Sequence, residues 1–125
     1  MITKWESGYI LKVYIGADFV PTDNDTPIDK FGHNLKSPTK TINGFTAIPS
    51  LLLGLANNHC YDQGFEGLES TIHVLTQANI AYCGAGNDVN EAKKPYIFTK
   101  DGIRLGIYMC TENEFSSATM HSAGA

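Results

Sequence analysis

Short apolar runs recur along the chain and are separated by longer polar or mixed stretches. β-branched and aromatic residues occupy five of the seven positions 9–15, which predicts a mostly buried strand that ends at Gly16. A second run predicts a strand at residues 50–56, after a short helical turn, and a third predicts a strand at residues 80–83.

One amphipathic helix is predicted between the second and third strands. Spacings of three, four and three residues place four apolar side chains on one helix face: Phe65, Leu68, Ile72 and Leu75. Asp62 precedes this pattern, and we interpret it as the N-cap because aspartate accepts hydrogen bonds from the first free backbone amides. His73 lies away from the apolar face and is expected at the surface.

The end of the chain is predicted to contain a short helix and a hairpin. Residues 87–94 can form one or two helical turns, and two apolar runs at residues 96–99 and 103–110 flank Asp101-Gly102. Aspartate followed by glycine favours the two-residue type I′ turn. The order of strand, loop, strand, helix, strand, helix and hairpin indicates an α/β fold with helices on the faces of a sheet.

The segment at residues 19–44 interrupts this pattern. It contains three prolines and many Asp, Asn, Ser and Thr residues, and it is about 25 residues long, whereas loops inside compact domains are seldom longer than about 15. Three interpretations are open: a functional loop, a disordered loop, or the site of an internal deletion. Residues 116–125 are expected to form a tail.

Composition limits the classes of function. The 125 residues suffice for a single domain, and 42% hydrophobic and 18% charged residues are typical of a globular chain. A net charge of −4 argues against nucleic acid or an anionic membrane as the main partner. Three cysteines without close spacing argue against a disulfide framework and for free, buried thiols. No signal peptide or membrane-spanning run is visible, so we expect a cytoplasmic protein.

Polar residues follow the predicted strands where α/β proteins usually bind ligands. Asp18 follows the first strand, and the sequence "LANNHCYDQG" at residues 55–64 places Asn57, Asn58 and His59 after the second. Carboxylate, amide and imidazole groups can bind Mn, Fe or Zn, and histidine can also transfer protons near neutral pH. The alternative is a polar turn that only ends the strand. Further candidates follow the later strands: Glu112, Glu114 and the turn Gly84-Ala85-Gly86, which we interpret as a tight turn.

A longer set of motifs resembles the CapA family of capsule (poly-gamma-glutamate) synthesis proteins, within the calcineurin-like metallophosphoesterase superfamily. The motifs are Ala-Asn-Asn-His at residues 56–59, Asp-x-Gly at 62–64, Gly-Leu at 67–68, Gly-Ala-Gly at 84–86 and Glu-Ala-x-x-Pro at 91–95. They cover about half of the chain in the order of the family. The resemblance implies part of a metallophosphoesterase-like β-sandwich flanked by helices, an incomplete four-layer α/β/β/α fold.

The resemblance also implies roles for individual residues. Asp18 and Asn58 would be metal ligands, and His59 would be a catalytic residue and a further ligand. Asn57 would support the turn, whereas Asp62 is interpreted as a helix cap and not as a ligand. The implied cofactor is a divalent metal, Mn, Fe or Zn, and the implied substrate is a small-molecule or polymer-precursor phosphoester.

The chain departs from the family pattern, and this leaves two main hypotheses. Residues 20–46 lack the family's Asn-x-Glu motif, Val20 stands where the superfamily has the histidine of Asp-x-His, and the family's later histidine motifs are not present in residues 1–125. The first hypothesis is a CapA-type metallophosphoesterase. The alternative is an inactive, truncated fragment that acts as a folded or interaction domain and self-associates through an exposed sheet edge and the apolar residues 50–56. A third interpretation, a nucleotide-binding flavodoxin-like module, rests only on the alternation of strands and helices.

Overall fold

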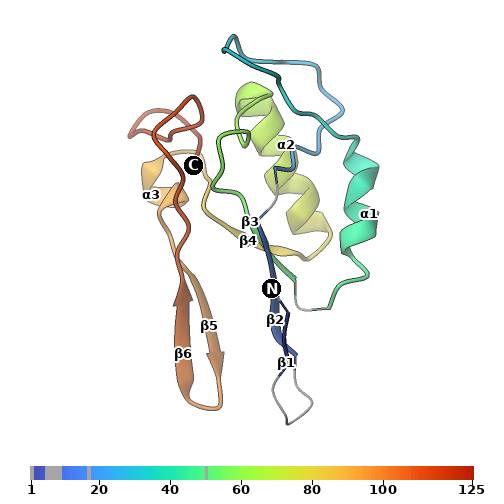
Figure 1. Ribbon diagram of the computed structural model, residues 1–125, viewed down its shortest axis with the longest axis vertical. Coiled ribbons are helices and arrows are strands. Elements are labelled where there is room, and N and C mark those ends of the chain that lie inside the picture. Colours follow the sequence, from blue (N-terminus) through green and yellow to red (C-terminus); the bar gives the residue numbers. More distant parts are fainter. Residues whose placement is uncertain (1, 5–9, 17, 50) are drawn as a thin grey trace.

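A four-stranded sheet in the order β1-β2-β3-β4 forms the centre of the computed structural model, which describes residues 2–4, 10–16, 18–49 and 51–125 (Figure 1). The strands are β1 (Ile2–Lys4), β2 (Ile10–Gly16), β3 (Leu51–Gly54) and β4 (Ala81–Cys83). β1 pairs antiparallel with β2, whereas β2, β3 and β4 run parallel. The α/β class predicted from the sequence is therefore confirmed.

The register of the parallel strands brings their carboxyl ends to one edge of the sheet. Gly16 of β2 pairs with Gly54 of β3, and Gly54 also pairs with Cys83 of β4. β3 is central and its residues are all buried, as expected for a parallel strand that is covered on both faces. The segments that follow β2, β3 and β4 consequently start from the same side of the sheet.

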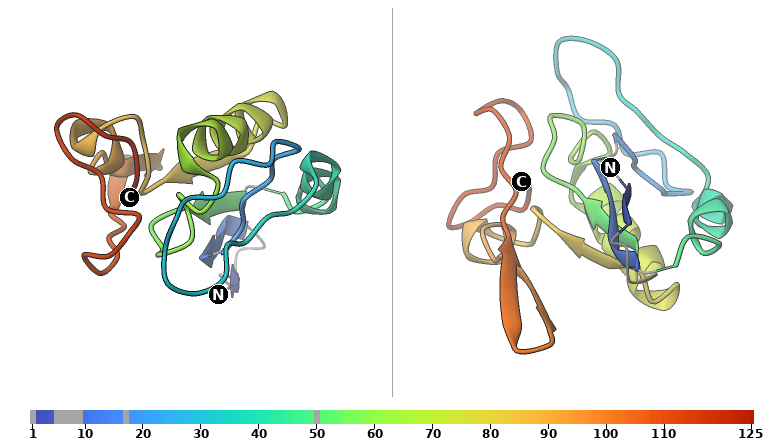
Figure 2. Two further views of the ribbon diagram at one scale, coloured as in Figure 1. Left: turned by 90° about the horizontal axis from the view of Figure 1, so that it is seen from above. Right: turned by 60° about the horizontal axis from the view of Figure 1, so that its bottom comes forward.

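The apolar face of α2 (Gly64–Gln77) covers one face of this sheet, above β3 and β4 (Figures 1 and 2). Leu68 and Leu75 are at most 1% exposed and pack in one core with Leu53 and Leu55. The predicted helical stripe is thus confirmed at Leu68, Ile72 and Leu75, whereas Phe65, in the first turn of the helix, is 48% exposed and does not belong to the core. The remaining helices are short: the 3₁₀ helix η1 (Thr39–Thr41), α1 (Ile42–Phe45) and α3 (Val89–Ala92).

The hairpin of β5 (Tyr96–Lys100) and β6 (Ile103–Ile107) forms a second, two-stranded sheet that extends beside the central one (Figure 1). Asp101 and Gly102 both have positive φ angles, 50° and 79°, which confirms the predicted type I′ turn. Large apolar side chains remain exposed on both faces of the hairpin: Ile97, Ile103 and Leu105. The hairpin is thus more exposed than β3, whose residues are all buried.

Several expectations need correction or addition. Residues 51–55 are buried inside the chain, so the expected apolar patch at residues 50–56 is wrong for the part that the structure describes. β1 was not predicted.

Residues 116–125, expected as a tail, fold back onto the domain: Gly124 pairs with Gly86, and Ala123 belongs to the core. The structure describes the backbone of residues 10–15 but not the burial of their side chains, so the predicted burial of this strand is not tested. Tyr9 lies outside the described residues.

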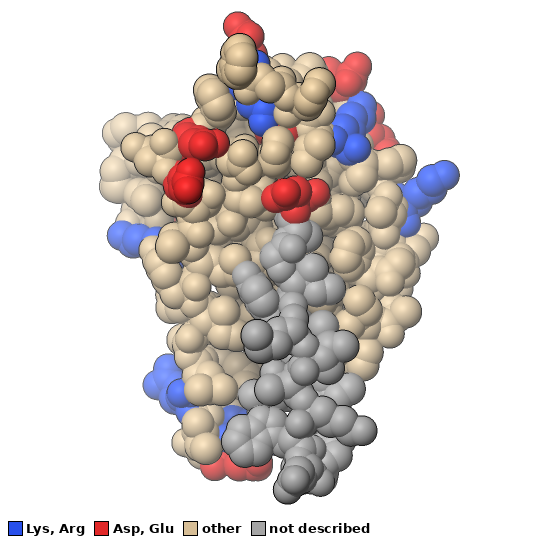
Figure 3. Space-filling model, viewed as in Figure 1, with Lys and Arg blue, Asp and Glu red and all other residues tan. Residues whose placement is uncertain are grey.

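The surface shown in Figure 3 carries acidic and basic side chains, and neither sign forms a continuous patch on that face. Within the described part of the chain, no helix has the length and apolar character needed to cross a membrane.

Candidate active site at the strand ends

The turn between β3 and α2 is shaped by its own polar groups. The side-chain oxygen Oδ1 of Asn57 accepts a hydrogen bond from the backbone N–H of His59 at 2.8 Å, and the N–H of Asp62 donates to the carbonyl of His59 at 3.1 Å. An asparagine that bonds the backbone two residues further on favours a tight turn over continued strand. This geometry explains why the apolar run stops at Asn57 and gives that residue a supporting contact to His59.

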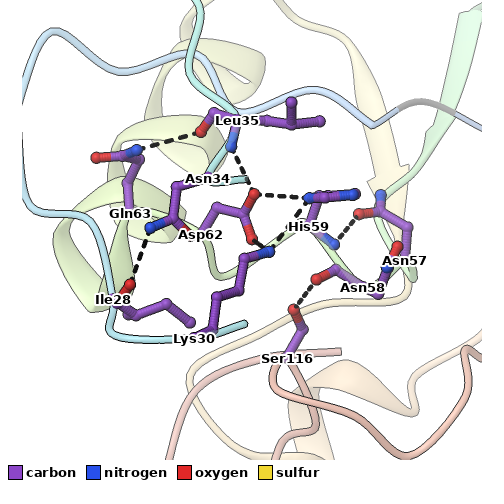
Figure 4. Close-up of polar contacts among 10 residues, drawn as sticks. All are labelled: Ile28, Lys30, Asn34, Leu35, Asn57, Asn58, His59, Asp62, Gln63 and Ser116. Carbon is purple, nitrogen blue, oxygen red and sulfur yellow. Dashed lines mark hydrogen bonds and ion pairs between the residues drawn. The ribbon is translucent and has the colours of Figure 1, made fainter. Parts of the chain in front are cut away.

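His59 is held through one of its ring nitrogens (Figure 4). Its Nδ1 lies 2.7 Å from Oδ2 of Asp62, and Lys30 forms an ion pair with Oδ1 of the same carboxylate. The side chain of Asp62 is fully buried, that of Lys30 is 3% exposed, and that of His59 is 23% exposed. A carboxylate–imidazole pair therefore lies at the border between the interior and the solvent.

The hydrogen bond to Asp62 determines which nitrogen of His59 is available for chemistry. An ionised carboxylate can only accept, so Nδ1 must carry the proton that joins the two side chains. Lys30 Nζ is 3.3 Å from the same Nδ1 but is also only a donor, so it shares Asp62 as acceptor and does not bond the ring. Nε2 has no hydrogen-bond partner among the described residues, and it is the nitrogen that can contact a ligand.

The interpretation of Asp62 as the helix N-cap is wrong. The N-cap of α2 is Gln63, and its side chain makes no capping hydrogen bond. The Asp62 carboxylate instead contacts His59, Lys30 and the backbone N–H of Leu35, the last at 2.6 Å. Local rules placed Asp62 at the helix end, but two distant donors, Lys30 and Leu35, and His59 of the same turn bind its oxygens instead.

The irregular segment at residues 18–38 is bound to this turn by several hydrogen bonds. Gln63 accepts from the N–H of Thr26 at 3.2 Å and donates to the carbonyl of Leu35 at 3.2 Å. The N–H of Ile28 donates to the carbonyl of Asp62 at 3.0 Å. The sequence left three interpretations of this segment open: a functional loop, a disordered loop or the site of a deletion. These contacts contradict the disordered loop. Lys30, Leu35 and Gln63 were not anticipated, because their partners are far away in the sequence.

Asn58 lies in a pocket next to this network. The pocket has a volume of about 570 Å³ and is lined by one residue of the β3–α2 turn and by four that follow β6: Asn58, Cys110, Thr111, Glu112 and Glu114. The pocket thus brings Asn58 together with the two glutamates that follow the last predicted strand. The buried hydroxyl of Ser116 donates to the backbone carbonyl of Asn58 at 2.7 Å, which fixes the turn from the side of the C-terminal segment.

The cysteine beside the site is not prepared for nucleophilic chemistry. Cys60 is buried, and burial raises the pKa of its thiol from 9.0 to about 11, more than the hydrogen bond of Ser116 lowers it. A thiolate is the reactive form of cysteine. Cys83 is also buried and Cys110 is exposed, and all three are free thiols, so free thiols are confirmed and burial is confirmed for two of them.

The donors that the structure describes are too few for a complete metal site. No three His, Cys, Asp or Glu side chains in the described ranges lie close enough to hold a metal ion. Asp18 is exposed just after β2, at the same sheet edge as Asn58. With Nδ1 of His59 bound to Asp62, only Nε2 is left, and one nitrogen cannot ligate a metal and exchange a proton with a substrate together. The two roles predicted for His59 therefore compete.

The remaining sequence candidates lie apart from this chemistry. His33, His73 and His121 are exposed, as predicted. Gly84 has a φ of 93°, and a Cβ at this position would lie 2.9 Å from the Cβ of Ala56. The positive φ supports the interpretation of residues 84–86 as a tight turn, which follows β4 and leads to α3 (Val89–Ala92).

Fold and site together define an α/β domain with an Asn-Asn-His turn at the carboxyl ends of its parallel strands. Residues 14–125 match the profile of the bacterial capsule synthesis protein PGA_cap family, and the chain belongs to this family.

Curated relatives agree with this assignment. The chain is 27% identical to the PGA biosynthesis protein CapA of Bacillus subtilis, over 74% of this chain and 26% of the relative. It is 29% identical to the capsule biosynthesis protein CapA of Bacillus anthracis, over 58% of this chain and 18% of the relative. It is also 39% identical to a probable polyglutamine synthesis accessory protein of Mycobacterium tuberculosis, over 43% of this chain and 14% of the relative. The matched part spans about a quarter or less of each relative.

Proposed function

We propose that this protein acts in bacterial capsule synthesis, in the formation of a poly-glutamate polymer, and that His59 transfers a proton in the hydrolysis of a phosphoester. The capsule role is supported by the family and by the names of its relatives. The catalytic role is supported by one observation above all: Asp62 holds Nδ1 of His59 at 2.7 Å, while Nε2 has no hydrogen-bond partner among the described residues and the side chain is 23% exposed.

The proposed reaction assigns one step to each group. A water oxygen attacks phosphorus, and the bond between phosphorus and the ester oxygen breaks. The protonated ring of His59 donates its Nε2 proton to the leaving oxygen, and the proton released by the attacking water restores the ring. Asp62 keeps the ring in one tautomer and orientation and stabilises its charged form, as a carboxylate does for histidine in many hydrolases. The substrate would be a small-molecule or polymer-precursor phosphoester.

Hydrolysis of bis(p-nitrophenyl) phosphate tests this proposal. The natural chain, His59→Gln and His73→Gln are compared, with and without Mn²⁺. His73 is a matched control because it is an exposed histidine on α2, away from the turn. We expect turnover that His59→Gln abolishes and His73→Gln leaves unchanged. Equal turnover in both variants would contradict the role of His59, and no turnover by the natural chain would favour the inactive-fragment alternative.

We also propose that a divalent metal binds at Asp18 and Asn58, the two predicted ligands that remain when His59 exchanges protons. Binding to the native state raises the unfolding midpoint. With two ligands we expect 1 mM Mn²⁺ to raise the midpoint by less than about 2 °C. A larger rise that Asn58→Ala removes would show that the residues assemble a stronger site than their number suggests.

A further inference from the structure

The irregular segment at residues 18–38 brings one buried positive charge to the site. Lys30 has a side-chain exposure of 3%, although its neighbours Asp29 and Phe31 are exposed, Phe31 to 95%. Lysine is among the residues least often buried, and it is buried almost only with a partner. The partner here is Asp62, so the segment turns one side chain inward, toward the carboxylate that holds His59 (Figure 4).

Three donors occupy the carboxylate of Asp62. Lys30 binds Oδ1, the N–H of Leu35 donates to Oδ2 at 2.6 Å, and Nδ1 of His59 donates to Oδ2 at 2.7 Å. Two of the three donors come from the segment 18–38. These two donors bind different oxygens of the carboxylate, so the segment restrains the rotation of the group that His59 contacts.

We propose that Lys30 is a positioning residue for His59, acting through Asp62. This inference deepens the proposed function, since His59 is the catalytic residue only if that proposal holds. The physical reason is that a buried carboxylate without a positively charged partner raises the free energy of the folded chain. Without the ammonium, Asp62 gains by turning toward water, and Nδ1 of His59 loses its fixed acceptor. The segment 18–38 would therefore be functional, which is one of the interpretations that its length left open.

The competing explanation is an ion pair that only attaches the segment to α2. The structure argues against this reduced role because the segment has other attachments: Thr26 and Leu35 bond Gln63, and the carbonyl of Pro21 accepts from the hydroxyl of Ser70 at 3.0 Å. Attachment does not require Lys30. The feature that requires it is the buried charge of Asp62, next to His59.

The test compares Lys30→Met, Lys30→Arg and Lys36→Met. Methionine keeps most of the aliphatic chain and removes the charge, whereas arginine keeps the charge. Lys36 is the matched control, because it lies in the same segment and pairs at 3.3 Å with Asp25, whose side chain is 86% exposed. The first readout is a ¹H–¹⁵N correlation spectrum of the imidazole rings, which reports the tautomer of His59 without any need for catalysis. Exposed His33, His73 and His121 serve as internal references.

We expect the natural chain, Lys30→Arg and Lys36→Met to show His59 with a protonated Nδ1. Lys30→Met should lose this signal while the backbone amide spectrum stays folded. If the chain hydrolyses phosphoesters, Lys30→Met should lower kcat by up to about 100-fold with little change in KM. A normal His59 signal in Lys30→Met would overturn the proposal.

Unfolding of both Lys30→Met and Lys30→Gln would also overturn it, because the residue would then serve stability alone. A change in the His59 signal in a chain without turnover would support the positioning role and count against the proposed function, so the two failures are distinguishable.

Discussion

The turn that holds His59 and the β5–β6 hairpin are stabilised in opposite ways. The turn is surrounded by segments that are distant in sequence, and its charged groups are buried and paired with one another. The hairpin makes its described strand pairings only within itself and leaves Ile103 64% exposed. A two-stranded hairpin alone is marginally stable in water. The comparison teaches that buried charged contacts between distant segments lie at the strand ends, where the proposed chemistry takes place.

Removing the carboxylate at the centre of the turn should cause the largest loss of stability. Asp62→Ala leaves the ammonium of Lys30 buried without its partner and the N–H of Leu35 without its acceptor. We expect the free energy of unfolding to fall by about 3 to 5 kcal/mol, measured by urea denaturation.

Asp25→Ala is the control for this substitution, since it breaks an exposed ion pair with Lys36 and should cost at most about 1 kcal/mol. Similar losses in the two variants would mean that the buried network contributes no more than a surface pair.

Leucine truncation extends the comparison to the apolar contacts. Leu75 is fully buried against the sheet, and Leu75→Ala should lower the free energy of unfolding by about 2 to 5 kcal/mol through lost contacts and a cavity. Leu105 on the hairpin is 43% exposed, and Leu105→Ala should cost about 0.5 kcal/mol. Thermal and urea unfolding measure both. Equal losses would show that the hairpin packs as tightly as the core.

The sequence predicted the local elements of the fold but not the contacts between distant residues. Period and spacing predicted β3, α2 and the hairpin turn, because each depends on neighbours within a few residues. β1 has only three residues, too few to show a pattern. The site was predicted at Asn57, Asn58 and His59, but the contact between Lys30 and Asp62 joins residues 32 positions apart. No local rule contains that pairing, and the capping rule assigned Asp62 to the wrong partner.

The hairpin turn should respond to substitution without affecting the turn of His59. Gly102 has a φ of 79° and no atom within 4 Å of a Cβ built at that position, so Gly102→Ala introduces backbone strain but no clash. We expect a cost of about 1 kcal/mol that is confined to the hairpin. Amide hydrogen exchange should become faster in β5 and β6 and stay unchanged in α2. Faster exchange in α2 would show that the two regions are coupled.

The smallest effect at neutral pH is expected at Cys60, and it appears only in alkali. Its pKa is raised by burial from 9.0 to about 11, so between these values the unfolded chain loses the thiol proton while the folded chain retains it. Stability should therefore be complete below pH 9 and should decrease as the pH rises toward 11. Burial also raises the pKa of Tyr82 and of Cys83, which add a decrease in the same direction.

Urea denaturation of the natural chain and of Cys60→Ala at pH 8 and pH 10.5 separates these contributions, because the variant retains only the part due to other groups. An equal decrease in both proteins would mean that Cys60 ionises alike in the folded and unfolded states, and that the turn beside His59 is more open to water than its burial indicates.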